Sequence, residues 1–129
     1  MTADLDLDPE QREELTRLLG GATLGSLLQE WQRFVTAVER GYDDSIYEYT
    51  NDLSVRDRLE GVAAGAGPGL RAKLHGALAE DDRRFAAATQ EADRPLGEFA
   101  EAAPSWWRRV PRRRVGELAE DLDALGYLG

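Results

Sequence analysis

The segment that decides the fold is residues 24–40, LGSLLQEWQRFVTAVER, in which apolar residues recur every three or four positions. The polar residues between them, such as Glu30 and Arg33, fall on the opposite side of a helical wheel. Thr23 is a suitable helix N-cap, and Gly41 stands where a left-handed C-terminal residue belongs. We therefore expect an amphipathic helix over 24–40 with its apolar stripe in the core. The stripe consists of Leu24, Leu27, Leu28, Trp31, Phe34, Val35 and Val38.

Start and stop signals predict further helices on both sides of this segment. A capping aspartate followed by proline, and a later pair of glycines, predict a helix over 9–19. A stripe of leucine and alanine after a glycine-rich turn predicts another over 69–92. We expect a short acidic helix over 95–103 and a last amphipathic helix over 115–125, closed by a glycine.

Residues 43–64 carry two apolar faces that do not line up on one helix. The apolar residues of the first half share one side, and those of the second half point nearly the opposite way. Ser54 has N-cap character, so we predict two helices, 43–52 and 55–64. A single continuous helix buried on two sides is the alternative.

These elements define the expected fold class. No stretch alternates polar and apolar residues over a useful length, so we predict no sheet. The prediction is an all-α, single-domain irregular bundle of five to six helices that covers residues 1–129, with residues 1–7 frayed.

Charge narrows the range of partners. The chain of 129 residues has 25 acidic and 16 basic side chains, which gives a formal net charge of −9. Residues 106–115 carry five arginines and no acid, so the rest of the chain carries −14. Such a body repels nucleic acid and anionic lipid and attracts basic molecules. We therefore predict no nucleic-acid or membrane partner and a basic protein as the partner.

The remaining composition bears on location and source. The acidic start, Met1 to Asp6, lacks the apolar stretch of a signal peptide, and no run of about 18 apolar residues follows. Without cysteine, disulfides and thiolate metal sites are excluded. We expect a cytoplasmic protein, and we interpret the excess of arginine over the single Lys73 as the mark of a high-GC bacterial genome.

Acidic pairs at helical spacing raise the possibility of a metal-dependent hydrolase, because such pairs can present oxygens to Mg²⁺. Most of the candidates fall on predicted polar faces, and no two helices both offer an inward-facing pair. His75, the single histidine, has no evident nucleophile or orienting acid beside it. We predict no catalytic residues, no metal and no cofactor, and keep the hydrolase as an alternative.

One carboxylate is out of place in this pattern. Asp81 falls within the apolar stripe of the 69–92 segment, and an isolated buried charge costs several kcal/mol. Arg56 also continues an apolar face, so we predict that Asp81 and Arg56 form a buried polar pair.

The segment beginning Trp106-Trp107-Arg108 combines aromatic rings with arginines and is a secondary candidate interface. Arginine can pair with phosphate, and tryptophan can stack on bases or lie at a membrane surface. The acidic body argues against both uses. We favour packing of one tryptophan on the core, with the arginines paired to nearby carboxylates and stacked on the rings.

An acidic tyrosine segment, residues 41–52, is the main candidate for binding a partner. Tyr49 is expected to face inward, whereas Tyr47 lies off that face among acids. An exposed ring supplies contact area and the acids supply steering. The predicted partner-binding residues are Tyr47, Asp43, Asp44, Glu48 and Asp52.

The run from Trp31 to Glu60 resembles small acidic helical bacterial proteins, some of which act as immunity partners of secreted toxins. The resemblance favours a stoichiometric binding protein and transfers no functional residue. The sequence thus predicts a small acidic non-enzymatic protein-binding module, immunity-like or regulatory. A metal-dependent hydrolase and a structural helical homodimer are the alternatives.

Overall fold

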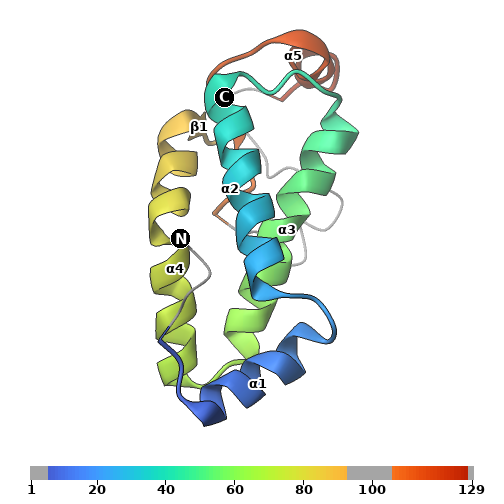
Figure 1. Cartoon of the computed structure of the whole chain (residues 1–129). Coiled ribbons are helices and arrows are strands. Elements are labelled where there is room, and N and C mark those ends of the chain that lie inside the picture. Colours follow the sequence, from blue (N-terminus) through green and yellow to red (C-terminus); the bar gives the residue numbers. More distant parts are fainter. Residues whose placement is uncertain (1–5, 93–105, 128–129) are drawn as a thin grey trace.

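Three long helices lie side by side in the computed structural model, which describes residues 6–92 and 106–127. The middle helix, α2, packs against both α3 and α4, while α1 crosses one end of the bundle and α5 covers the other (Figure 1). The all-α bundle predicted from the sequence is confirmed. The helices are α1 (Pro9–Leu19), α2 (Leu24–Arg40), α3 (Ile46–Gly65), α4 (Pro68–Ala88) and α5 (Gly116–Ala124).

The first two helices begin and end as their sequences predict. The Asp8 carboxylate accepts from the Gln11 backbone N–H at 2.8 Å, and the Gln11 side chain accepts from the Asp8 N–H at 3.1 Å, which completes a capping box. The Thr23 hydroxyl caps α2 by accepting from the Ser26 N–H at 3.2 Å. Gly20 closes α1 at a φ of +56°, a conformation that suits glycine.

The core is built on the apolar stripe of α2, all seven residues of which are buried. Aromatic rings connect this stripe to the neighbouring helices. The Trp31 ring centroid lies 5.1 Å from that of Phe85 on α4, and the Phe34 centroid lies 5.3 Å from that of Tyr49 on α3. Tilted and edge-on ring pairs at these distances add to the stabilisation from buried area.

The prediction of two helices over 43–64 is wrong, and the alternative of one continuous helix holds. The two apolar faces do not require a break, because α3 is covered on several sides by α1, α2, α4 and α5. Ser45, rather than Ser54, provides the N-cap, its hydroxyl accepting from the Glu48 N–H at 3.2 Å. The Ser54 hydroxyl donates instead to the carbonyl of Asn51 within the helix.

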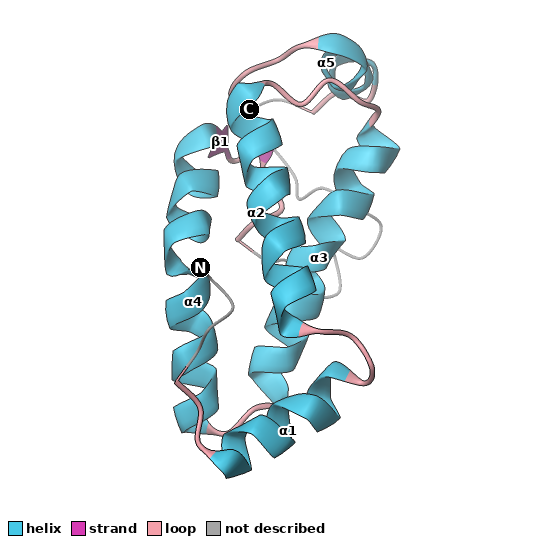
Figure 2. Ribbon diagram, viewed as in Figure 1, coloured by secondary structure: helices cyan, strands magenta, loops and turns pink. Residues whose placement is uncertain are grey.

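A small antiparallel pairing corrects the expectation of no sheet. Strand β1 (Thr89–Gln90) follows α4 directly and pairs with β2 (Val110–Pro111), close to the end of α4 (Figure 2). Helix α4 therefore ends at Ala88, four residues before the predicted end. Strands of two residues are too short to show an alternating pattern. The helix predicted over 95–103 lies outside the described residues.

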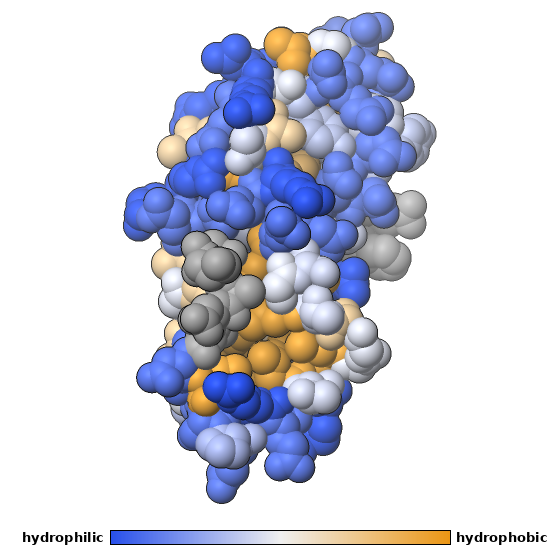
Figure 3. All heavy atoms as spheres, in the orientation of Figure 1, coloured by the Kyte–Doolittle hydropathy of each residue, from blue (hydrophilic) through white to orange (hydrophobic). Residues whose placement is uncertain are grey.

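The surface differs between the two ends of the bundle. Apolar side chains reach the surface at the α1 end (Figure 3), and Leu7, Leu18 and Leu19 are only partly buried against the core. The opposite end, around α5 and the start of α3, is mostly hydrophilic in the same view. Among the described residues, no helix has the length and apolar character needed to cross a bilayer.

Candidate functional site

The loop between α2 and α3, residues 41–45, carries two of the predicted partner-binding acids and is held in place by α5. The backbone N–H of Glu117 donates to the Asp43 carbonyl at 3.0 Å. Gly116 allows this approach, because a Cβ there would lie 2.6 Å from the Cβ of Asp43. The Asp121 carboxylate accepts from the first backbone N–H of α3 at 2.9 Å. The loop is thus fixed at Asp43 and at its junction with α3.

Three of the predicted acids line a hollow of about 390 Å³ at this loop. Asp43, Asp44 and Asp52 share it with Arg40, and the Tyr42 side chain forms part of its wall. We call these five residues the acidic hollow. Tyr47 and Glu48, which the sequence grouped with the same acids, do not line it.

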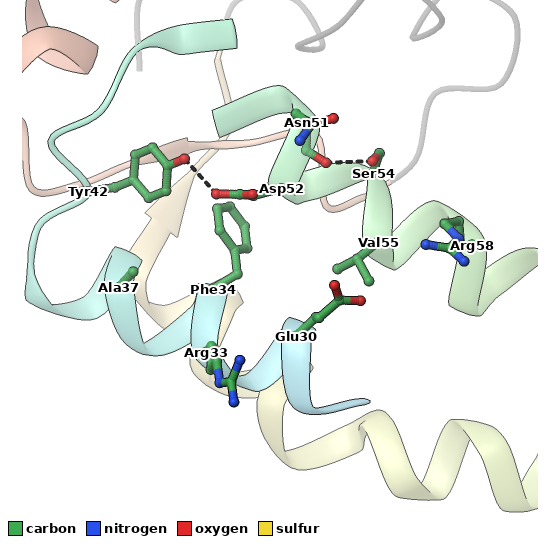
Figure 4. A pocket seen from close by; sticks show the side chains of 10 residues that line it. All are labelled: Glu30, Arg33, Phe34, Ala37, Tyr42, Asn51, Asp52, Ser54, Val55 and Arg58. Atoms are coloured by element: carbon green, nitrogen blue, oxygen red, sulfur yellow. Dashed lines mark hydrogen bonds between the residues drawn. The ribbon is translucent and has the colours of Figure 1, made fainter. Parts of the chain in front are cut away.

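A groove of about 400 Å³ between α2 and α3 adjoins the hollow and shares Tyr42 and Asp52 with it. Figure 4 shows Phe34 and Val55 as its apolar part, with the Tyr42 hydroxyl directed at Asp52. Glu30 and other charged side chains of both signs stand around it. The excess of acid is therefore at the end of the groove that meets the hollow.

The Tyr42 hydroxyl marks the point where the negative charges converge. It donates to the Asp52 carboxylate at 2.7 Å. Burial of the ring raises the pKa of Tyr42 well above the ordinary value, and so do this hydrogen bond and the charges of Asp52, Asp44 and Glu48. Glu48 thus acts on the same hydroxyl although it does not line the hollow. No pattern in the sequence indicates the bond between Tyr42 and Asp52.

Tyr47 differs from its neighbouring tyrosines in exposure. Its side chain is 80% exposed, whereas Tyr42 and Tyr49 are buried. The Tyr49 hydroxyl donates to the carbonyl of Arg109 at 2.8 Å, which ties α3 to the C-terminal segment. Tyr47 is therefore the aromatic ring of this region that a partner can reach without unfolding.

The predicted pairing of Asp81 with Arg56 is wrong, although both side chains are buried. Asp81 accepts from Arg84 at 3.0 Å, and Arg84 also binds Glu39 of α2 at 2.6 Å. The hydrogen bond from Arg84 lowers the pKa of Glu39, whereas burial raises the pKa of Asp81 against the opposing effect of Arg84. Asp81 therefore belongs to a link between α4 and α2.

Arg56 pairs with the next residue along α4 instead. Its guanidinium donates to both oxygens of Asp82, at 3.0 and 2.8 Å, and to Glu60 at 3.0 Å. The Asp82 carboxylate also accepts from the Trp31 indole at 3.0 Å. Successive helix residues differ by about 100° around the axis, so the two neighbouring acids meet different partners, Arg84 for Asp81 and Arg56 of α3 for Asp82.

The secondary candidate segment is largely engaged with the core. Trp107 is buried, and its indole donates to Asp57 at 2.8 Å. The Arg108 guanidinium pairs with the other oxygen of the same carboxylate. Trp106 is 44% exposed. Of the three residues proposed there, Trp106 is the one most open to a partner.

The histidine and acidic side chains of the described residues bear on the hydrolase alternative. Within residues 6–92 and 106–127, no group of three or more histidine, cysteine or acidic side chains is arranged to hold a metal ion. His75 is an exposed histidine whose ring nitrogen lies 3.3 Å from both oxygens of Glu60.

No protein-family model, curated protein or solved structure matches this chain.

Proposed function

We propose that this chain is a cytoplasmic protein-binding module that recognises a basic protein through the start of α3. The observation that carries the proposal is the exposure of Tyr47, at 80%, in a segment whose acids Asp43, Asp44 and Glu48 are also exposed. The ring would supply contact area that loses water on binding, and the acids would attract the partner. We define the binding face as the acidic hollow together with Tyr47 and Glu48.

The charges of the binding face support a basic partner rather than an acidic one. Asp43, Asp44 and Glu48 are exposed, and Arg40 is the one basic residue among those defining the face. The whole chain adds to this attraction with its net charge of −9. Long-range attraction raises the rate of encounter, but a lasting complex needs a buried anchor. Tyr47 fits that role on α3.

Crosslinking from the binding face is the experiment that tests the proposal. Tyr47 is replaced by p-benzoylphenylalanine in the full chain, and a second chain carries the same group at Leu125, which is 52% exposed. A basic protein captured from position 47 and not from position 125 would support the proposal. Capture of a second copy of the chain, or of an acidic protein, would contradict it.

Once a partner is captured, the contribution of the acids and that of Tyr47 can be measured independently. Asp44→Asn combined with Glu48→Gln should slow association several-fold and flatten its dependence on salt. Tyr47→Ala should instead speed dissociation about thirtyfold, as expected for a central anchor. Surface plasmon resonance at several salt concentrations measures both rates.

A matched control removes the same charge elsewhere. Glu10 and Glu13 are exposed on α1, at the other end of the molecule (Figure 1). Glu10→Gln combined with Glu13→Gln should change the association rate far less than the pair of substitutions on the binding face. Equal effects of the two pairs would show that net charge alone acts, and the binding face would lose its role.

A helical homodimer is the second candidate, and the apolar surface at the α1 end favours it. Leu7, Leu18 and Leu19 are only partly buried there, so a second copy could cover them. Sedimentation equilibrium over a range of concentrations distinguishes this candidate. A stable dimer that Leu18→Glu converts to a monomer would favour it over the basic partner.

A further inference from the structure

A third cavity, of about 540 Å³, lies between α3, α4 and the segment that begins at Trp106. This volume lies within the range of small-molecule sites in proteins. It shares no lining residue with the acidic hollow or the groove beside it. We call it the indole cavity. The lining residues used below are Arg56, Glu60, His75, Asp82, Trp106 and Trp107.

Two indole rings form a corner of the indole cavity. The ring centroids of Trp106 and Trp107 lie 5.8 Å apart, and their planes meet at 87°. Trp107 is buried, whereas Trp106 is 44% exposed. A corner of this kind presents electron-rich faces, which attract positive charge.

The cavity already holds one positive group against an indole. The Arg56 guanidinium carbon lies 4.5 Å from the ring centroid of Trp107. This position is that of a cation over a ring face. Trp106 presents a second ring to the same cavity, and among the described residues no cationic side chain lies over this ring. The protein's own packing thus shows which chemistry this corner accepts.

The charged groups of the cavity leave an excess of negative charge. Arg56 donates to Asp82 and to Glu60, so one guanidinium faces two carboxylates. His75, whose Nε2 lies 3.3 Å from Glu60, is counted as neutral in this balance, as it is in the formal charge of the chain. An anion would find the guanidinium already engaged, whereas a monocation would bring the cavity to neutrality. Glu60 is the more exposed of the two carboxylates, at 35% against 19% for the side chain of Asp82.

We propose that the indole cavity binds an organic monocation with an alkylated ammonium or guanidinium head, placed on the Trp106 ring and paired with Glu60. A bare metal ion suits the cavity less well, because Mg²⁺ and Ca²⁺ take six or more oxygen ligands and two carboxylates line the cavity among the described residues. The head can belong to a free small molecule or to a lysine or arginine side chain of a protein. This inference does not depend on the proposed function of the binding face.

Nuclear magnetic resonance of the three indole N–H groups of the full chain tests the proposal. The probes are choline, its neutral isostere 3,3-dimethylbutan-1-ol, and a tripeptide with a central trimethyllysine. Choline should shift the Trp106 signal saturably, and the neutral alcohol should bind about tenfold more weakly or not at all. Tighter binding of the tripeptide would assign the head to a protein side chain, and equal or weaker binding would assign it to a free molecule.

Two variants and one control complete the test. Trp106→Ala should abolish the response of the remaining indoles, and Glu60→Gln should weaken choline binding about fivefold to tenfold, because it removes the charge but keeps the shape. Glu80→Gln, which changes an exposed acid outside the cavity lining, should leave binding unchanged. Circular dichroism establishes whether each variant is folded. If Trp106→Ala does not fold, Glu60→Gln alone tests the proposal. Equal binding of the alcohol, an unaltered response in Glu60→Gln, or no response to either cation would overturn the proposal.

Discussion

Asp82→Ala should lower the free energy of unfolding by about 3–5 kcal/mol, close to the whole stability of a small domain. The reason is the environment of Arg56, which is 2% exposed. Asp82 binds two of the three guanidinium nitrogens of Arg56 and also accepts from the Trp31 indole. Its removal leaves a buried positive charge with Glu60 as its remaining carboxylate partner among the described contacts. Urea unfolding followed by circular dichroism measures the loss.

A neighbouring acid on the same helix provides the control. Glu80 is 74% exposed and pairs with Arg83 at the surface, so Glu80→Ala should cost less than about 1 kcal/mol. A double-mutant cycle between Arg56 and Asp82 should show strong coupling, whereas one between Arg56 and Asp81 should show effects that simply add. If Asp82→Ala lowered the free energy of unfolding as little as Glu80→Ala, Asp82 would not be the main partner of Arg56.

Alkaline pH should unfold the protein through two buried tyrosines. Burial raises the pKa of both Tyr42 and Tyr49 above the ordinary value of about 10, so the folded state keeps their protons longer than the unfolded chain does. Their contribution to stability is therefore complete below about pH 10 and is lost as the pH rises further. Each tyrosine should lower the free energy of unfolding by about 1.4 kcal/mol per pH unit above pH 10.

Phenylalanine variants and the absorbance of tyrosinate test this slope. Tyr42→Phe and Tyr49→Phe should each make the fall in unfolding free energy above pH 10 shallower by about 1.4 kcal/mol per unit. Tyr47→Phe, at a side chain that is 80% exposed, should not change it. Ionisation of all tyrosines near pH 10 in a chain that remains folded would show that Tyr42 and Tyr49 are accessible.

Local signals in the sequence were sufficient for the ends of α1 and α2 and for the core stripe. The caps of α1 and α2 depend on residues within three positions of each other, such as Asp8 with Gln11 and Thr23 with Ser26. The stripe of α2 depends on helical periodicity alone. Continuity of α3 depends instead on neighbours that cover several of its sides, and no pattern within the helix reports them.

Pairings between residues far apart in the sequence could not be predicted, and the reason is geometric. Asp81 and Asp82 carry the same charge, so charge alone does not say which of them pairs with Arg56. A rotation of about 100° around the axis of α4 decides it. The bond between Tyr42 and Asp52 joins a residue of the loop before α3 to a residue of α3, and both line the hollow. The exposure of Tyr47, in contrast, followed from its position off the apolar face of the helix.

The most direct test of the proposed function is a titration of the isotopically labelled chain with an arginine-rich peptide, observed through backbone amide signals at physiological salt. We expect the largest shifts on residues 42–48, and Asp44→Asn combined with Glu48→Gln should weaken binding of the peptide several-fold. Shifts concentrated on residues 106–114, or no saturable shift at 42–48, would contradict the proposed function.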